Sequence, residues 1–164
     1  MHQVTGDEIY LVVNAEGGSR IDVWESFAPT QADNDEQNFA AAVRRVQVAE
    51  ELTGSTLGGI IWHQGESGGN NAGHFDRLEV FFEDLREAFN DPALPIVTGE
   101  LSRLRVNSPP YNDALPIVTT FGNTDFTSAE GLTTVSADDL THFDAASQRE
   151  MGDRMALALS LIHI

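Results

Sequence analysis

The stretch IIWHQGESGG, residues 60–69, changes abruptly from apolar side chains to small and polar ones. Residues 58–62 are typical of a short strand buried on both faces, as in a parallel sheet covered by helices. His63, Gln64 and Glu66 follow at the carboxyl end of that strand, which is where open α/β sheets bind ligands. The stretch therefore predicts an α/β fold with a functional site here. A purely structural alternative, in which His63 and Glu66 cap the next helix or bond backbone, fits the spacing equally well.

Strand and helix patterns alternate around this stretch, as expected for α/β architecture. A helix between two strands of one sheet makes those strands parallel, so the sheet is expected to be parallel. The expected strands are residues 9–13 and 94–98, the expected helices are 33–52, 74–90 and a final helix that starts near Asp144, and 122–137 is expected to be a loop.

The six residues ALPIVT occur twice, at 93–98 and at 114–119. Both copies are predicted to be buried strands of one parallel sheet. The spacer of 15 residues between them barely accommodates a crossover helix. We therefore expect a reduced connection between the two copies.

The composition is that of one compact domain with an acidic surface. The chain has 164 residues, 41% of them hydrophobic, and 26 acidic against 9 basic side chains give a net charge of −17. This charge repels nucleic acid and anionic membranes, which are therefore not expected as partners. It suits a neutral substrate or a salty habitat, but the interpretation we favour is simply a soluble acidic surface. The sequence contains no cysteine, which excludes disulfides, zinc-thiolate sites and a cysteine nucleophile.

Three motifs resemble those of one enzyme family in order and spacing. WHQGES at 62–67 resembles the Trp-x-Gln-Gly-Glu-Ser motif of SGNH-type carbohydrate esterases, in the branch of the sialate O-acetylesterases and the acetylxylan esterases of carbohydrate esterase family six. NAEGGSRIDVW at 14–24 is similar to that family's Gly-Gly-Ser segment, and DLTHFD at 139–144 to its Asp-x-x-His segment. The resemblance implies a single domain over 1–164, folded as a three-layer α/β/α sandwich with a mainly parallel, flavodoxin-like sheet.

The same resemblance implies cleavage of acetyl esters on a small-molecule or polysaccharide sugar substrate, without a cofactor. His142 would be the general base, and Asp139 would hold its imidazole in the productive tautomer. Asp138 is adjacent to Asp139 but points to the opposite side of an extended chain.

The oxyanion donors implied by the resemblance are the backbone N–H of Gly18 and the side-chain amide of Gln64. Glu66 and His63 would orient the site. Taken alone, without the other two motifs, the Gly17-Gly18 pair favours an ordinary turn over a functional role.

The nucleophile is not identifiable in this chain. In the family it is a serine in a Gly-Gln-Ser-Asn turn after the first strand, and no such turn is present in the sequence. Ser19 and Ser67 belong to the other two motifs. We therefore expect the family's first strand to be missing and the domain to be amino-terminally truncated. Strands 9–13 and 60–62 would then close up, or residues 1–7 or another chain would fill the gap, and an exposed edge would favour self-association.

Three functions remain open. The first is a sugar O-acetylesterase whose nucleophile comes from elsewhere, and the second is a catalytically inactive, carbohydrate-binding remnant of the same fold. The third is a metal site built from His63, Glu66, His74 and His142. The spacing of His63 and Glu66 differs from the helical His-Glu-x-x-His pattern of zinc hydrolases, so no metal is expected.

Overall fold

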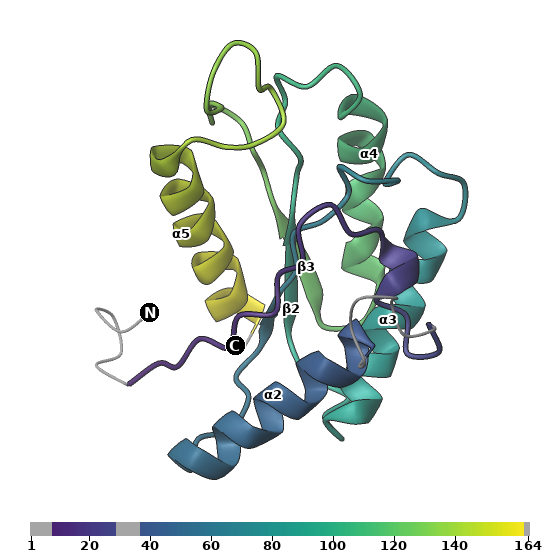
Figure 1. Cartoon of the computed structure of the whole chain (residues 1–164), viewed down its shortest axis with the longest axis vertical. Helices are drawn as coiled ribbons and strands as arrows, with labels where there is room; N and C mark the ends of the chain where they lie inside the picture. Colours follow the sequence, from purple (N-terminus) through teal and green to yellow (C-terminus); the bar gives the residue numbers. More distant parts are fainter. Residues whose placement is uncertain (1–7, 29–36, 163–164) are drawn as a thin grey trace.

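A parallel sheet of three strands forms the centre of the described part of the molecule. The computed structural model describes residues 8–28 and 37–162 (Figure 1). The strands are β1 (Ile60–Ile61), β2 (Ile96–Gly99) and β3 (Thr124–Thr127), arranged in the order β1-β2-β3. In this register Ile96 lies opposite both Ile60 and Thr124. The carboxyl ends of all three strands therefore lie at one edge of the sheet.

Helices cover both faces of the sheet and make three layers. Figure 1 shows α5 on one side, with α3 and α4 on the other. None of the helices in the described ranges is long and apolar enough to cross a membrane. The helices are α2 (Asn38–Thr53), α3 (His74–Ala88), α4 (Pro109–Ala114) and α5 (Ala145–Ile162), and the 3-10 helices are η1 (Ile21–Val23) and η2 (Leu115–Thr120).

The two faces of β2 support two separate hydrophobic cores. Ile96 packs into a cluster that contains Leu78 and Phe82 of α3, whereas the next residue, Val97, packs with Met151 and Met155 of α5. Ile96 and Val97 are both fully buried. This alternation is the period-two pattern of a strand covered on both faces, and it confirms the predicted α/β sandwich.

Several predicted elements are confirmed. The expected helix 74–90 is α3, and the helix expected from Asp144 begins at Ala145 as α5. The expected helix 33–52 is observed as Asn38–Thr53, while its first residues, 33–36, lie outside the described residues. The strands expected at 58–62 and 94–98 are present as β1 and β2, although β1 is only two residues long. The expected burial of 58–62 on both faces is wrong, because β1 is at the edge of the sheet and Ile61 is half exposed.

The second copy of ALPIVT was wrongly predicted to be a strand. Residues 115–120 form η2, in which Leu115 and Val118, three residues apart, are both fully buried. The spacing of three places both side chains on one face of the 3-10 helix. A reduced connection was expected between the two copies of ALPIVT. The short helices α4 and η2 make a reduced connection after β2, but it leads to β3 and the second copy is part of it.

The third strand was missed, because TDFT at 124–127 lies inside the stretch that was predicted to be a loop. This strand pairs in parallel with all four residues of β2. Its polar side chains have buried partners: Thr127 Oγ1, for example, contacts Met151 Sδ at 3.1 Å.

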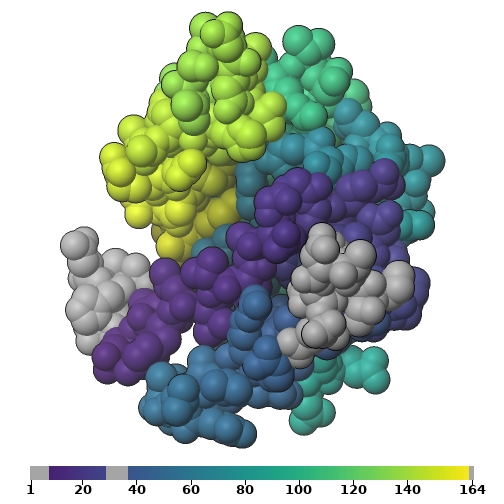
Figure 2. Space-filling model, viewed as in Figure 1, coloured from purple at the N-terminus to yellow at the C-terminus, as the bar shows by residue number. Residues whose placement is uncertain are grey.

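Residues 9–13 were also wrongly predicted to be a strand. They have no regular secondary structure, and Leu11 and Val13 are 82% and 76% exposed. In Figure 2 the amino-terminal segment crosses the visible face as a continuous purple band. Its β-branched side chains have no strand beside them in the described part of the chain, and propensity alone does not make a strand.

Strand β1 lies at an edge of the sheet. Within the described residues no strand pairs with its outer side, so the predicted closing up of 9–13 against it is wrong, and the filling of the gap by residues 1–7 falls outside the described residues. Ile61 is 49% exposed there. Self-association through this edge stays a prediction.

A buried cation, Arg86 near the end of α3, ties this helix to the starts of β2 and β3. The Arg86 guanidinium donates to the carbonyls of Leu94 (3.2 Å), Phe121 (2.9 Å) and Asn123 (3.1 Å) and to the hydroxyl of Thr124 (2.8 Å). Without Arg86 the carbonyl of Leu94 would lose this partner, whereas those of Phe121 and Asn123 would keep only the Thr124 hydroxyl and the Ile96 N–H. Hydrogen bonds from a charged group contribute more than neutral ones, so their loss is costly.

We expect Arg86→Met to lower the free energy of unfolding by about 3 kcal/mol, because the apolar chain approximately keeps the volume but removes four hydrogen bonds from a buried charged donor. Urea denaturation measures the difference. The matched control is Arg149→Met, since Arg149 is exposed on α5 and should change stability by less than about 0.5 kcal/mol. Equal unfolding free energies for the two variants would contradict this role.

Candidate active site

The loop after β1 is held rigidly at the carboxyl edge of the sheet. The Tyr111 hydroxyl, on a side chain that is 1% exposed, donates to the carbonyl of Gln64 at 2.9 Å. A Cβ on Gly65 would lie 2.6 Å from the Tyr111 ring, so only glycine fits there. The loop also closes on itself, because the N–H of Gly69 donates to the carbonyl of Gly65 at 2.9 Å. The backbone that carries Gln64 is therefore fixed from two sides.

The Gln64 side chain joins this loop to the Gly-Gly-Ser segment. It is 7% exposed, and its amide nitrogen donates to the carbonyls of Ser19 (3.3 Å) and Ser67 (3.1 Å). Its Oε1 is buried without a hydrogen-bond partner in the described residues. The predicted oxyanion donor therefore directs its N–H groups at the protein's own carbonyls. To bind an oxyanion, it would have to release one of them.

Gly18 lies in an open turn beside this loop. Its φ of +73° is in the left-handed region, and a Cβ there would meet nothing within 4 Å. A hollow of about 230 Å³ opens in front of it, lined by residues 16–20 and Val23. The turn is pinned by Ser19, whose hydroxyl donates to the carbonyl of Glu16 at 2.7 Å and accepts from the indole of Trp24 at 2.8 Å. Ser19 is thus part of the turn's own hydrogen bonding.

His142 and Asp139 are in direct contact. His142 Nδ1 lies 2.8 Å from Asp139 Oδ2, and the backbone N–H groups of Thr141 and His142 donate to Asp139 Oδ1 at 3.0 and 3.1 Å. The hydrogen bond from His142, followed by these backbone bonds, lowers the pKa of Asp139. The side chain of Asp138, by contrast, makes no hydrogen bond within the described chain. The geometry is that of an imidazole whose tautomer is fixed by a carboxylate, with Nε2 left facing outward on a side chain that is 73% exposed.

Phe143 places the His142 loop next to the end of β1. The ring of Phe143 lies 5.9 Å from the ring of His63. His63 in turn is 3.1 Å from the carbonyl of Glu100 through Nε2 and 4.0 Å from Glu66 Oε1 through Nδ1. The predicted orienting residues His63 and Glu66 thus face each other beside the strand exits.

The histidines of the metal hypothesis do not come together. His74 packs against Phe75 and Tyr111 instead of against His63. Within 8–28 and 37–162, no group of three or more His, Asp or Glu residues could hold a metal ion.

A buried carboxylate, Glu100, fixes the ends of β2 and β3 relative to each other. It accepts two hydrogen bonds from Arg103, at 2.7 and 2.8 Å, and one each from the Ser128 hydroxyl and the Ala129 N–H. Burial alone would raise the pKa of Glu100, but these hydrogen bonds outweigh it and leave the pKa lowered.

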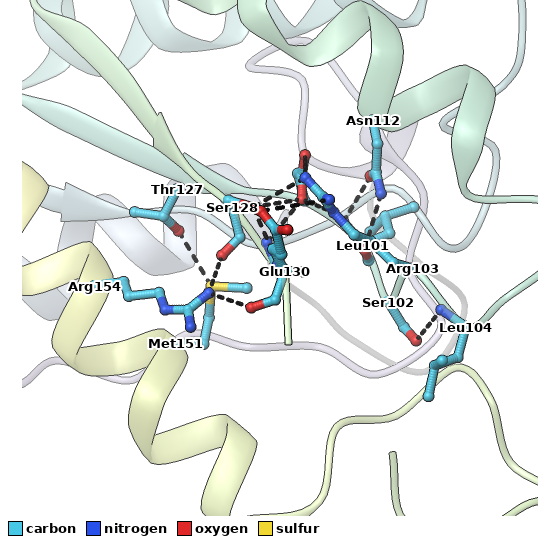
Figure 3. A network of polar contacts seen from close by, with 12 residues as sticks. Leu101, Ser102, Arg103, Leu104, Asn112, Thr127, Ser128, Glu130, Met151 and Arg154 are labelled. Atoms are coloured by element: carbon cyan, nitrogen blue, oxygen red, sulfur yellow. Dashed lines mark hydrogen bonds and ion pairs between the residues drawn. The ribbon is translucent and has the colours of Figure 1, made fainter. Parts of the chain in front are cut away.

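Arginines from two different elements meet at the segment after β3. Figure 3 shows Arg103 and Arg154 both reaching Ser128 and Glu130. Sequence reasoning did not find this network. A charged residue, Glu100, directly after a buried strand was the available signal.

No described serine is paired with His142. The hydroxyls of Ser136 and Ser147 accept from nearby backbone N–H groups, and that of Ser102 accepts from Leu104 N. Among residues 8–28 and 37–162, the side-chain partner of His142 is Asp139.

Comparison with known proteins places this geometry in context. A model of the family described as "carbohydrate esterase, sialic acid-specific acetylesterase" matches residues 1–160. No curated protein matches the chain. A similar solved structure is the X-ray structure of a protein from Arabidopsis thaliana, with a TM-score of 0.64 and 20% sequence identity, covering 88% of this chain and 57% of that one. This chain thus spans a little over half the length of that protein, and the likeness shows a shared α/β fold.

We expect His142→Ala to raise the pKa of Asp139 toward the ordinary value of 3.8, because its largest stabilising contact is lost while the two backbone bonds remain. A carboxyl-carbon NMR titration measures this. A lowered folded-state pKa means that the contact stabilises the fold above the unfolded pKa, and that this contribution disappears as the pH falls through the folded pKa. Asp144, whose pKa is lowered mainly by Thr133, is the internal control and should not move. An unchanged pKa of Asp139 would contradict the pairing in solution.

Proposed function

We propose that this chain, which belongs to the sialic acid-specific acetylesterase family of carbohydrate esterases, acts as a hydrolase on acetyl esters of sugars. The observation that carries the proposal is the 2.8 Å contact between Asp139 and His142 in the segment that follows β3. An oriented imidazole with a free Nε2 is what general-base catalysis of acyl transfer requires.

In this mechanism His142 Nε2 removes the proton of a serine hydroxyl, whose oxygen attacks the acetyl carbonyl carbon. His142 then gives that proton to the sugar oxygen as it leaves, and a water molecule cleaves the acetyl-serine in the same way. Asp139 stabilises the imidazolium that forms in each step. The nucleophilic serine is not among the described residues that contact His142.

The oxyanion would be bound by the N–H of Gly18 and the amide of Gln64. The open space in front of Gly18 supports its role. Gln64 is less simply placed, because binding would break one of its bonds to Ser19 or Ser67. His63 and Glu66 would hold the loop between these donors and the base.

A carbohydrate-binding protein without catalysis is the second proposal. One observation favours it: no described serine hydroxyl contacts His142. In that case the pocket would bind a sugar that the chain does not cleave.

We expect Asp139→Asn to lower the rate of hydrolysis of a small acetyl ester by about 10²- to 10⁴-fold, because an amide favours the wrong imidazole tautomer. Asp138→Asn is the matched control and should keep the rate within about twofold, since Asp138 is exposed and the carboxylate that contacts His142 is that of Asp139. Equal rates in the two variants would refute the assignment of Asp139 and His142.

Labelling with a fluorophosphonate probe, followed by mass spectrometry, separates the two proposals. We expect an esterase to be labelled on one serine, and His142→Ala to abolish that labelling because the serine is no longer activated. If the wild-type chain shows neither labelling nor turnover, this result contradicts the esterase proposal and supports the binding protein.

A further inference from the structure

A second hollow adjoins the one in front of Gly18. It has a volume of about 150 Å³ and lies between η1, the loop after β1 and the first turn of α3. Arg20 lines both hollows, so the second hollow is next to the proposed ester site. The polar side chains that line it are Arg20, Asp22, Ser67, Asn71, His74 and Arg77.

His74 is the most informative residue in this wall. It is 2% exposed, and neither of its ring nitrogens has a hydrogen-bond partner among the described residues. Burial, and then the charge of Arg77, lower the pKa of His74. Its ring is therefore neutral at pH 7, with one nitrogen as a donor and the other as an acceptor. Buried polar groups are normally paired, so this ring points to a partner supplied by a ligand.

Asp22 contributes a second unsatisfied atom. Its Oδ1 is buried without a hydrogen bond in the described part of the chain. Arg20 Nε lies 3.4 Å away, close enough for an ion pair but not in hydrogen-bond geometry. The wall therefore offers an acceptor at Asp22 and both a donor and an acceptor at His74.

The charges in this wall favour an uncharged ligand. Each arginine already faces a carboxylate: Arg20 faces Asp22 at 3.4 Å, and Arg77 faces Glu25 at 3.6 Å. The His74 ring is neutral, so no net positive charge is left for an anion. The net charge of −17 on the whole chain opposes an anion further.

We propose that this hollow is a subsite for one uncharged pyranose ring, whose hydroxyl groups bond His74 and Asp22. A hydroxyl both donates and accepts, so it can bond the unpaired ring nitrogens of His74 and the Asp22 oxygen, which makes an ion pair with Arg20 but no hydrogen bond. The hollow is much larger than a single water molecule needs, which leaves room for a sugar ring. The assignment deepens the proposed function, which supplies the sugar, but it concerns binding and does not require turnover.

The test is a titration of the full chain with two sugar probes, monitored by NMR through the ring ¹⁵N signals of its histidines. The probes are methyl β-D-glucopyranoside and methyl β-D-glucopyranosiduronate, which differ in a carboxylate at one ring carbon. We expect the neutral glucoside to shift the His74 signals with a Kd on the order of 1 mM. The glucuronide should bind about tenfold more weakly, because the wall has no free positive charge.

Two substitutions probe the two unpaired groups separately. His74→Phe keeps the aromatic shape beside Phe75 and Tyr111 but removes both nitrogens, and Asp22→Asn removes the charged acceptor. Each should weaken glucoside binding about tenfold, measured by calorimetry or by backbone amide shifts. The matched control is Asp76→Asn, an exposed carboxylate on the same turn of α3 that does not line the hollow, and its affinity should stay within about twofold. Asp22→Asn keeps the test valid if His74→Phe does not fold.

The outcomes separate the subsite from the esterase proposal. Tighter binding of the glucuronide would overturn the subsite as stated and identify an anion site. Unchanged His74 signals with both probes, or equal glucoside affinity in wild type and Asp22→Asn, would also overturn it. Glucoside binding lost in Asp22→Asn but kept in Asp139→Asn would support the subsite even if the chain hydrolyses no ester.

Discussion

The rest of the structure depends on β2, the buried strand between β1 and β3. The exit of β1 is fixed to it through the hydrogen bond from Trp62 N to the Val97 carbonyl. The exit of β3 is fixed through Glu100, whose N–H donates to the carbonyl of Thr127 and whose carboxylate accepts from the N–H of Ala129. A Cβ on Gly99 would collide with Met155 of α5, so this helix packs directly against the strand. The segments that follow β1 and β3 are thus both positioned relative to one strand that is covered on both faces.

The two halves of the proposed site differ in how they are held. Gln64 is buried, and the hydrogen bond from the Tyr111 hydroxyl to its carbonyl fixes its backbone. His142 is exposed and is held by Asp139 within its own loop. Preorganised donors need no rearrangement during a reaction, whereas the Gln64 amide would first have to release the carbonyl of Ser19 or Ser67. An oriented base at an exposed position, by contrast, can meet a nucleophile from another segment.

The residues that sequence could predict are those whose local pattern agrees with their environment. The motif residues at 62–67 follow a strand, and α3 has an apolar stripe of helical spacing, so both elements were predicted correctly, although β1 is an edge strand and not buried on both faces. The family predicted from the motifs is confirmed as well. The two copies of ALPIVT were indistinguishable by pattern, and packing alone made one of them β2 and the other η2. Strand β3 was missed because TDFT is polar, and its burial depends on partners far away in sequence, such as Arg86 and Met151. The absence of hydrogen bonds to the His74 ring within the described residues could not be predicted either. It depends on how η1, the loop after β1 and α3 pack together.

The acidity of the chain sets the electrostatic problem that an acetylesterase on this fold has to solve. A net charge of −17 opposes the negative charge that develops on the carbonyl oxygen in the transition state. Salt screens such a diffuse field beyond roughly 8 to 10 Å, whereas an N–H group in contact with the oxyanion is hardly screened. Local dipoles at Gly18 and Gln64 would therefore have to outweigh the global charge. The same charge would repel the acetate anion that the proposed hydrolysis produces, so a field that opposes the proposed chemical step would favour the departure of its product.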